Sequence, residues 1–213
     1  LVNSVFTKVH KNYDLMNDIM SLGIHRVWKK KFIDWMNPQP NTKLIDVASG
    51  TGDIAKLFFN HTNARAEILC LEPNTEMYKE GKIKLSKIKN IKWVNAMAEK
   101  IPEDDNTFDY YAISYGLRNV SEINKALKEA YRVLKTGGKI ITLTPEWKYF
   151  YKTFYEDFTH RTPFTKISLR DIQLICNFKN IEVESFRQLP FMWNRSKLIT
   201  IIFEFLSEIT RVI

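Results

Sequence analysis

Cysteine, glycine and proline are all scarce in this chain of 213 residues, which has two, seven and seven of them. The cysteines, Cys70 and Cys176, cannot form a disulfide framework, so a reducing compartment is expected. The low content of glycine and proline excludes collagen, flexible linkers and disordered tails. The four histidines show no ligand spacing with cysteine or acidic residues, and no metal site is predicted.

Long apolar runs are also absent. No stretch reaches the roughly 18–20 uninterrupted apolar residues that a membrane-spanning helix needs. Residues 1–30 contain Asp14, Asp18 and several lysines and lack an apolar core, so we expect no signal peptide.

Positive charge is in excess, with 32 basic against 24 acidic residues and a formal net charge of +8. Six lysines lie in residues 79–92, between apolar residues such as Ile83 and Ile88. No aromatic residues stand among these lysines to stack bases. We therefore interpret the segment as the solvent-facing side of a surface helix, and nucleic acid is not an expected partner.

Strands and helices alternate through the middle of the chain. Residues 4–37 have the apolar spacing of a helical arm, which the two prolines of residues 38–40 end. The alternation that follows predicts parallel βαβ units in an α/β fold, with a mostly parallel sheet covered by helices on both faces. The expected strands are 43–47, 67–71, 92–95, 109–114 and 139–144, and the expected helices are 53–60, the lysine-rich segment and 121–134.

The pattern is less regular beyond Pro145. Ser168-Leu-Arg-Asp171 predicts a capping box that opens a helix, and residues 181–187 predict a strand. Residues 196–212 predict a strongly apolar helix. Core packing is its first interpretation, whereas dimerisation and attachment to a membrane interface stay open.

The most informative stretch is the turn after the first strand, Asp46-Val-Ala-Ser-Gly50-Thr51-Gly52-Asp53. Gly50 and Gly52 permit backbone conformations and a close approach that a Cβ atom would forbid. Glu72 follows about twenty residues later, at the end of the second strand, where an acid can accept both hydroxyls of a ribose. These residues predict a nucleoside site at the carboxyl ends of parallel strands.

Two cofactors fit this nucleoside site. Residues 50–55 formally match the glycine fingerprint of dinucleotide-binding proteins. The Asp46 carboxylate would repel a pyrophosphate, but it suits the sulfonium and amino groups of S-adenosylmethionine. We therefore favour S-adenosylmethionine over a nicotinamide cofactor and over a tight turn without a ligand.

Two longer motifs carry a family resemblance. Residues 13–29 (YDLMNDIMSLGIHRVWK) and 114–120 (SYGLRNV) are similar to the two signatures of the ubiquinone/menaquinone biosynthesis C-methyltransferase family, and residues 5–141 resemble it throughout. The resemblance implies the Rossmann-like class I methyltransferase fold. It also implies methylation of a ring carbon in a prenylated quinol or phenol.

The resemblance also implies roles in cofactor binding. It puts Thr51 at the methionyl part of the cofactor, Glu72 at the ribose and Ser114 beneath the cofactor. It puts Met97 and Ala98 beside the adenine. Met97 departs from the family pattern, which has a polar residue at that place.

Four residues are candidates for the chemistry. Arg118 would stabilise the phenolate of the acceptor, its alternative being a surface ion pair with Glu122. Asn119 would orient the same oxygen or a water molecule. Tyr13 would close over the site, and His160 would serve as a base, while helix packing for Tyr13 and loop bracing for His160 stay open.

The last third departs from the family pattern and leaves open the methylation of another small or lipid-linked acceptor. The departure at Met97 leaves open a catalytically silent scaffold in a biosynthetic complex. An RNA methyltransferase is the weakest alternative, since only the net charge of +8 suggests it. We expect one domain, with an arm at 1–37, a cofactor-binding core at 43–144 and substrate-side elements at 145–213. It would work in the cytoplasm or at the inner membrane, on the matrix side in mitochondria, and a homodimer stays open.

Overall fold

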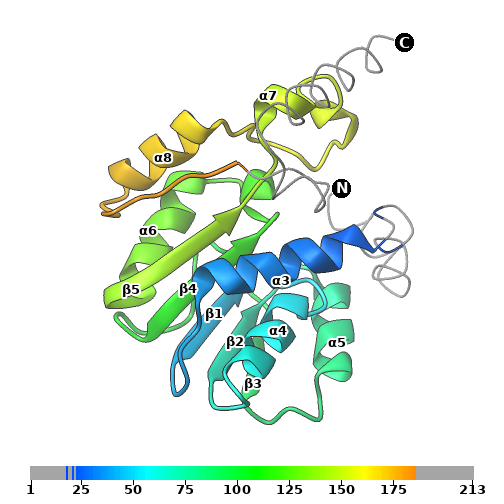
Figure 1. The fold of residues 1–213 in the computed structure, drawn as a ribbon, viewed down its shortest axis with the longest axis vertical. Helices are drawn as coiled ribbons and strands as arrows, with labels where there is room; N and C mark the ends of the chain where they lie inside the picture. Colours follow the sequence, from blue (N-terminus) through cyan, green and yellow to red (C-terminus); the bar gives the residue numbers. More distant parts are fainter. Residues whose placement is uncertain (1–17, 19–20, 22, 186–213) are drawn as a thin grey trace, which may run out of the picture.

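A five-stranded parallel sheet organises the described part of the chain, which is residues 18, 21 and 23–185 of a computed structural model (Figure 1). The strands lie in the order β3-β2-β1-β4-β5. Because the order reverses at β1, the carboxyl end of β1 is the switch point at which ligands of such sheets bind. The strands are β1 (Lys43–Val47), β2 (Glu67–Leu71), β3 (Ile91–Val94), β4 (Phe108–Ser114) and β5 (Leu134–Leu143).

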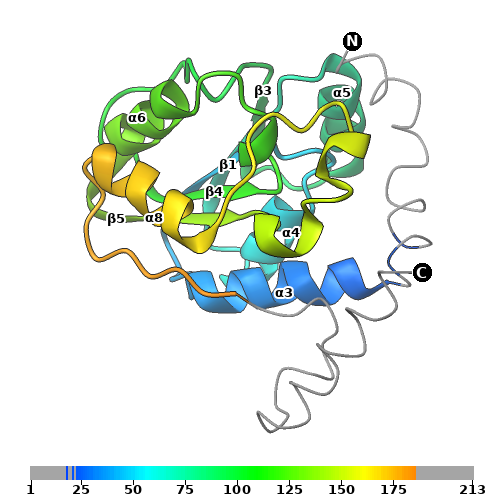
Figure 2. The same cartoon turned by 90° about the horizontal axis from the view of Figure 1, so that it is seen from above.

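Helices cover both faces of this sheet, and Figure 2 shows α3 and α6 on opposite sides of it. The α-helices are α3 (Ile24–Met36), α4 (Asp53–His61), α5 (Thr75–Lys84), α6 (Ile123–Val133), α7 (Trp147–Phe150) and α8 (Lys166–Ile175). Two 3₁₀ turns, η2 (Leu117–Asn119) and η3 (Phe154–Glu156), follow β4 and α7. In Figure 1 the chain rises from the end of β5 toward α7, beyond the carboxyl ends of the strands.

Alternate strand residues point into two separate cores. In β1, Ile45 and Val47 join the core beneath α6, whereas Leu44 joins the core beneath α3 and α4. The same alternation holds in β4, where Tyr111 and Tyr110 belong to opposite cores. The central strands β1, β2 and β4 are buried on both faces and are nearly continuous apolar runs, as is typical of parallel sheets.

The predicted fold class is confirmed, and most predicted elements exist within a few residues of their expected ends. β1 and β2 have the predicted bounds. The helical arm is confirmed over α3, and the rest of it, with Tyr13, lies outside the described residues. The predicted apolar helix at 196–212 also lies outside them.

Four local predictions were wrong. The fifth strand begins at Leu134, directly after α6, and not at residue 139. The lysine-rich helix ends at Lys84, so the last three lysines of residues 79–92 lie beyond it. Helix α8 begins at Lys166, because the Thr165 side chain is the cap and Ser168 is the third helical residue of the same box. Residues 181–185 are not in a strand.

The start of α6 is capped from outside the helix. Its own N-cap residue, Glu122, makes no side-chain cap bond. Instead, Glu99 Oε1 accepts the backbone N–H groups of Ser121 at 3.0 Å and of Glu122 at 3.3 Å. This carboxylate therefore joins the loop after β3 to the helix that covers one face of the sheet.

Removing this cap should destabilise the protein. Glu99→Ala is expected to lower the free energy of unfolding by about 0.5–2 kcal/mol, the usual cost of a lost cap, because two N–H groups lose their acceptor. Glu99→Gln should cost less, since its amide oxygen still accepts. Urea denaturation followed by circular dichroism measures both, with the exposed Asp104→Ala of the same loop as the control. Equal midpoints for Glu99→Ala and the control would contradict the prediction.

Candidate cofactor and acceptor site

The glycine turn after β1 is held by a carboxylate from the end of β2. Gly50 and Gly52 both have left-handed backbones, with φ of +59° and +83°. Glu72 Oε2 accepts the N–H of Gly50 at 2.8 Å, and Oε1 accepts the N–H of Asn74 at 2.9 Å. The predicted ribose acid therefore also fixes the shape of the turn.

The environment of Glu72 suits a polar ligand. The residue is 6% exposed. Burial raises the pKa of its carboxyl to about 7, against the opposing effect of the N–H bonds from Asn74 and Gly50. Each oxygen accepts one of these bonds, which leaves further lone pairs on both for the hydroxyls of a ribose.

Asp46 lies one residue before the end of β1 and is 1% exposed. Its Oδ2 is buried without a hydrogen-bond partner. Burial, and secondarily the nearby Glu72 carboxylate, raise the pKa of Asp46 to about 8, despite a hydrogen bond from the Ala55 backbone. A carboxylate that is buried without a partner is stabilised by a nearby positive charge, and the sulfonium and ammonium groups of S-adenosylmethionine would supply one.

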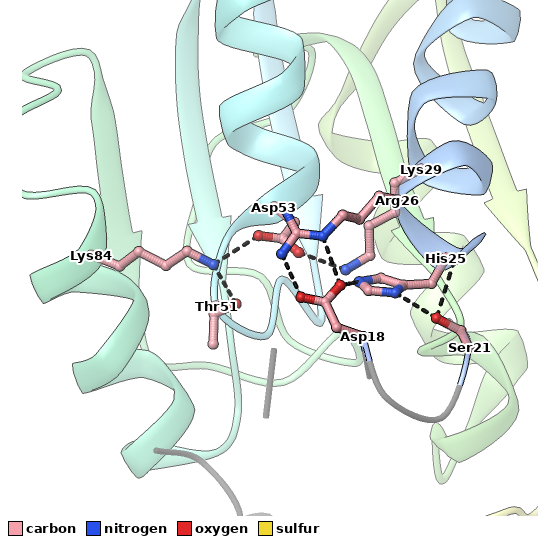
Figure 3. A network of polar contacts seen from close by, with 8 residues as sticks. All are labelled: Asp18, Ser21, His25, Arg26, Lys29, Thr51, Asp53 and Lys84. Atoms are coloured by element: carbon pink, nitrogen blue, oxygen red, sulfur yellow. Dashed lines mark hydrogen bonds and ion pairs between the residues drawn. The ribbon is translucent and has the colours of Figure 1, made fainter. Parts of the chain in front are cut away.

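Asp53, the first residue of α4, is held between two lysines (Figure 3). Lys29 Nζ of α3 lies 2.6 Å from Oδ2, and Lys84 Nζ at the end of α5 lies 2.8 Å from Oδ1. Burial acts to raise the pKa of Asp53, but the two lysines outweigh it and hold that pKa well below its usual range. Lys84 also donates to Thr51 Oγ1 at 3.1 Å, so the network reaches the predicted methionyl position.

The second signature forms the turn after β4, which packs on the glycine turn. Tyr115 has a left-handed backbone, with φ of +59°. A Cβ atom on Gly116 would lie 2.5 Å from Cβ of Ala48, so only glycine allows the two turns to touch here. Ser114, the last residue of β4, has its Oγ buried without a hydrogen-bond partner. The predicted cofactor and acceptor motifs therefore meet at adjacent strand ends.

Arg118 lies in η2, just beyond this contact. Its guanidinium is 5.3 Å from the ring centroid of Tyr115. Glu122, the alternative partner expected from the sequence, forms an ion pair with Lys125 at 3.7 Å. Asn119 Oδ1 is buried without a hydrogen-bond partner in the same turn.

The loop between η3 and α8 brings His160 to η2. The carbonyl oxygen of Arg118 accepts the N–H groups of Arg161 at 2.9 Å and Thr162 at 3.1 Å. His160 Nδ1 lies 2.7 Å from the Phe154 carbonyl oxygen, and Nε2 lies 3.3 Å from Asp157 Oδ2. The structure therefore places Arg118, Asn119 and His160 in one region.

The remaining predicted residues are more dispersed. Met97 is 56% exposed in the loop after β3, whereas Ala98 is buried in the core beneath α6. A groove of about 690 Å³ lies elsewhere, between the start of α6 and α8, and none of the predicted site residues lines it. Among the described residues, no three His, Cys, Asp or Glu side chains group as a metal site would require. No helix in that part of the chain has the length and apolar character needed to cross a membrane.

Sequence reasoning missed two parts of this region. The Asp53 network was not predicted, although Lys29 stands in the first signature. Asp157 was not predicted either, although its spacing of three residues from His160 was a visible signal.

A model of the ubiE/COQ5 methyltransferase family matches residues 1–166. The chain belongs to this family. It is 48% identical over 164 residues to the ubiquinone/menaquinone biosynthesis C-methyltransferase UbiE of Rickettsia akari, covering 74% of this chain and 65% of that protein. It is 48% identical over 148 residues to the protein of the same name from Brucella suis, covering 67% and 55%. The chain therefore spans less than two thirds of the length of either relative.

Solved structures support the fold at much lower identity. A chain in the complex of the Haloferax volcanii Trm112 methyltransferase activator with a methyltransferase has a TM-score of 0.72 at 16% identity, covering 82% of this chain and 79% of that one. This likeness shows the fold alone. Family membership confirms the predicted resemblance and indicates S-adenosylmethionine as the cofactor.

The raised pKa of Asp46 makes the stability of the cofactor-free protein depend on pH. A carboxyl with a folded pKa of about 8, against 3.8 in the reference state, stabilises the fold fully below about pH 4 and loses this contribution as the pH rises toward 8. Asp46→Asn removes that loss. The unfolding free energy of the variant relative to wild type should therefore increase from pH 5 to pH 8, by at most about 1.4 kcal/mol per pH unit.

Urea denaturation at several pH values measures this difference. The exposed Asp104→Asn is the control. A constant difference for Asp46→Asn would show that Asp46 does not carry the raised pKa.

Proposed function

We propose that this chain is an S-adenosylmethionine-dependent C-methyltransferase that acts on a prenylated quinol or phenol in ubiquinone or menaquinone biosynthesis. The observation that carries the proposal is the pair of buried acids, Asp46 and Glu72, on either side of the Gly50 turn. The names of relatives at 48% identity support the acceptor class. When bound, the cofactor supplies an electrophilic methyl group on a sulfonium.

Glu72 would accept the ribose hydroxyls and Asp46 would face the cationic groups of the cofactor. Ser114 Oγ, buried at the neighbouring strand end, would lie beneath them. Thr51 would meet the methionyl part of the cofactor. Lys84 donates a hydrogen bond to the Thr51 hydroxyl, and its positive charge suits the methionyl carboxylate. The backbone of the turn at Gly50 and Gly52 would form the wall of this site, with Met97 and Ala98 beside the adenine.

Arg118 would supply fixed positive charge to the acceptor oxygen as the phenol ionises. Asn119 would orient that oxygen or a water molecule through its buried amide. Tyr13 lies outside the described residues, and its closing role remains a prediction from the resemblance. A closed site of this kind would exclude water from the sulfonium and align the acceptor for an in-line transfer.

A second candidate is methylation of another small or lipid-linked acceptor. Helix α8 lies almost entirely beyond the residues that the family model matches, and it packs near the acceptor-side loop. A labelled-methyl assay that compares quinol with non-quinol acceptors separates the two candidates. Binding of the cofactor without transfer to any acceptor would favour the silent scaffold instead.

We also propose that residues 1–213 form one methyltransferase domain with a small-molecule quinol acceptor. A polyprenyl tail would keep that acceptor in a membrane, so a peripheral position at the inner membrane is compatible with work in the cytoplasm or the mitochondrial matrix. A homodimer and attachment to a membrane interface rest on the sequence prediction for residues 196–212, whereas contact with a biosynthetic complex rests on the departure at Met97.

The cofactor site is tested by Glu72→Gln. Affinity for S-adenosylmethionine should fall at least about tenfold, since hydrogen bonds to charged groups contribute ~1.5–3 kcal/mol each. The amide oxygen can still brace one N–H of the turn, so folding should persist. Isothermal calorimetry measures the affinity, with Glu76→Gln of α5 as the control. Unchanged affinity in a folded Glu72→Gln variant would refute the ribose assignment.

The acceptor site is tested by Arg118→Ala. It should reduce kcat by about 10²–10³, the range for loss of one oxyanion donor, and should barely change cofactor affinity because the sulfonium is itself cationic. Arg118→Lys should recover part of the rate, since a point charge does not replace a planar fork of donors. Labelled-methyl transfer to a quinol gives the rates, with the exposed Arg161→Ala as the control. A near-wild-type rate for Arg118→Ala would leave Arg118 with a structural role only.

A further inference from the structure

The ring of Tyr115 contacts both Arg118 and the arm helix α3. The guanidinium of Arg118 lies over this ring, 5.3 Å from the ring centroid. The ring of Trp28 in α3 lies 6.5 Å from the same centroid, with 43° between the two ring planes. Both distances are in the ranges of favourable cation–π and aromatic contacts. Tyr115 therefore connects the arm to the residue that we propose for the phenolate.

The backbone of Tyr115 fixes the direction of this ring. Its φ of +59° is in the left-handed region, which residues with a bulky side chain rarely adopt. The N–H of Tyr115 donates to the carbonyl oxygen of Leu143 in β5 at 2.7 Å. Backbone conformations of this kind are costly, persist only where the surrounding structure fixes them, and cluster at functional sites. The turn that leads to Arg118 thus also sets the direction of the Tyr115 side chain.

The Tyr115 ring is partly buried and uncharged. It packs against the core beneath α3 and α4. Burial raises the pKa of its phenol to about 12, although the charge of Arg118 acts in the opposite direction. The hydroxyl therefore keeps its proton near neutral pH, and the contact with Arg118 is one between a cation and a neutral ring.

A neutral ring suits a guanidinium that must act on an anion. A carboxylate partner would bind Arg118 more firmly, but it would neutralise the charge and occupy N–H donors that a phenolate needs. The face of a ring attracts the cation through its quadrupole and leaves the net charge unchanged. Tyr115 can therefore restrict the guanidinium without weakening its effect on the acceptor oxygen.

Helix α3 also contacts the donor side of the site. Lys29, the residue after Trp28, has its Nζ 2.6 Å from Oδ2 of Asp53, the first residue of α4. Because α4 directly follows the glycine turn, this ion pair ties α3 to the element that would carry the cofactor. Trp28 therefore supports the Tyr115 ring from a helix whose position is tied to the donor side.

We propose that Tyr115 is a positioning residue for the methyl transfer: its ring, supported by Trp28, holds the Arg118 guanidinium where the acceptor oxygen develops negative charge. The inference rests on the proposed function, in which Arg118 stabilises the phenolate. Tyr115 acts through Arg118 and takes no part in forming or breaking bonds. The ring face carries this role, so phenylalanine should replace tyrosine and an aliphatic residue should not.

Nuclear magnetic resonance of the full chain tests the contact without turnover. The ring current of an aromatic side chain shifts the signals of nearby protons, and Arg118→Lys identifies the signal of the Arg118 Nε–H group. We expect this signal to move in Tyr115→Leu and to stay near its wild-type position in Tyr115→Phe. The exposed Tyr131→Leu of α6 is the control. An Arg118 signal that is the same in Tyr115→Leu as in the wild type would overturn the contact.

A double-mutant cycle with a quinol acceptor tests the role in transfer. Tyr115→Leu should lower kcat about tenfold, the scale of one lost cation–π contact, with the KM for the cofactor unchanged. Tyr115→Phe should keep most of the rate. In an Arg118→Ala background, Tyr115→Leu should cause little further loss, because the residue through which it acts is gone. Trp28→Leu should show the same pattern with a smaller loss, and it repeats the test should Tyr115→Leu fail to fold.

The outcomes separate this inference from the proposed function. If Tyr115→Leu leaves kcat unchanged, or reduces it equally with and without Arg118, the positioning role is overturned alone. A Tyr115→Phe variant as slow as Tyr115→Leu would overturn it too, since the ring would not carry the effect. A wild type that binds the cofactor but methylates no acceptor would overturn the proposed function and the positioning role with it.

Discussion

The Glu72 carboxylate fixes the glycine turn to the end of β2, and the rest of the site depends on this contact. Its oxygens accept the N–H groups of Gly50 and Asn74, which lie on two different strand-to-helix connections. With the turn fixed, Asp46 stays buried behind it, and Asp53 starts α4 where lysines of α3 and α5 converge. Glu72 thus links the end of β2 to the turn that runs from Asp46 to Asp53.

The two sides of the switch point differ in charge. Asp46 and Glu72 stand at the carboxyl ends of β1 and β2, whereas Arg118 follows β4 and faces the loop of His160. In the proposed reaction the donor is cationic and the acceptor becomes anionic. Each would therefore meet a surface of opposite charge, and the transferred group would lie between them. This difference in charge arises because β1 and β2 end at acidic residues, whereas the turn after β4 carries Arg118.

The sheet and the glycine turn were predictable because apolar runs and turn residues are local signals. The ion pairs of Asp53 were not, because Lys29 and Lys84 are 24 and 31 residues away in sequence and meet it only through helix packing. The hydrogen bond between His160 and Phe154 was not predictable either, because it uses the backbone carbonyl of Phe154, which no side-chain pattern reveals. The start of α8 was mispredicted because two residues fit a capping pattern. Ser168 was expected to be the cap, but Thr165 is the cap and Ser168 is the third helical residue.

The contact of Gly116 with Ala48 has a consequence for the geometry of transfer. Because Gly116 has no side chain, its backbone lies directly against the Cβ atom of Ala48, which keeps the turn that would carry the donor close to the turn that leads to Arg118. Any larger residue at 116 would push the two turns apart and would lengthen the path of the methyl group in the proposed reaction. Such a variant would keep every chemical group of the site and would still be slower, because the contact between Gly116 and Ala48 sets the distance between the two turns.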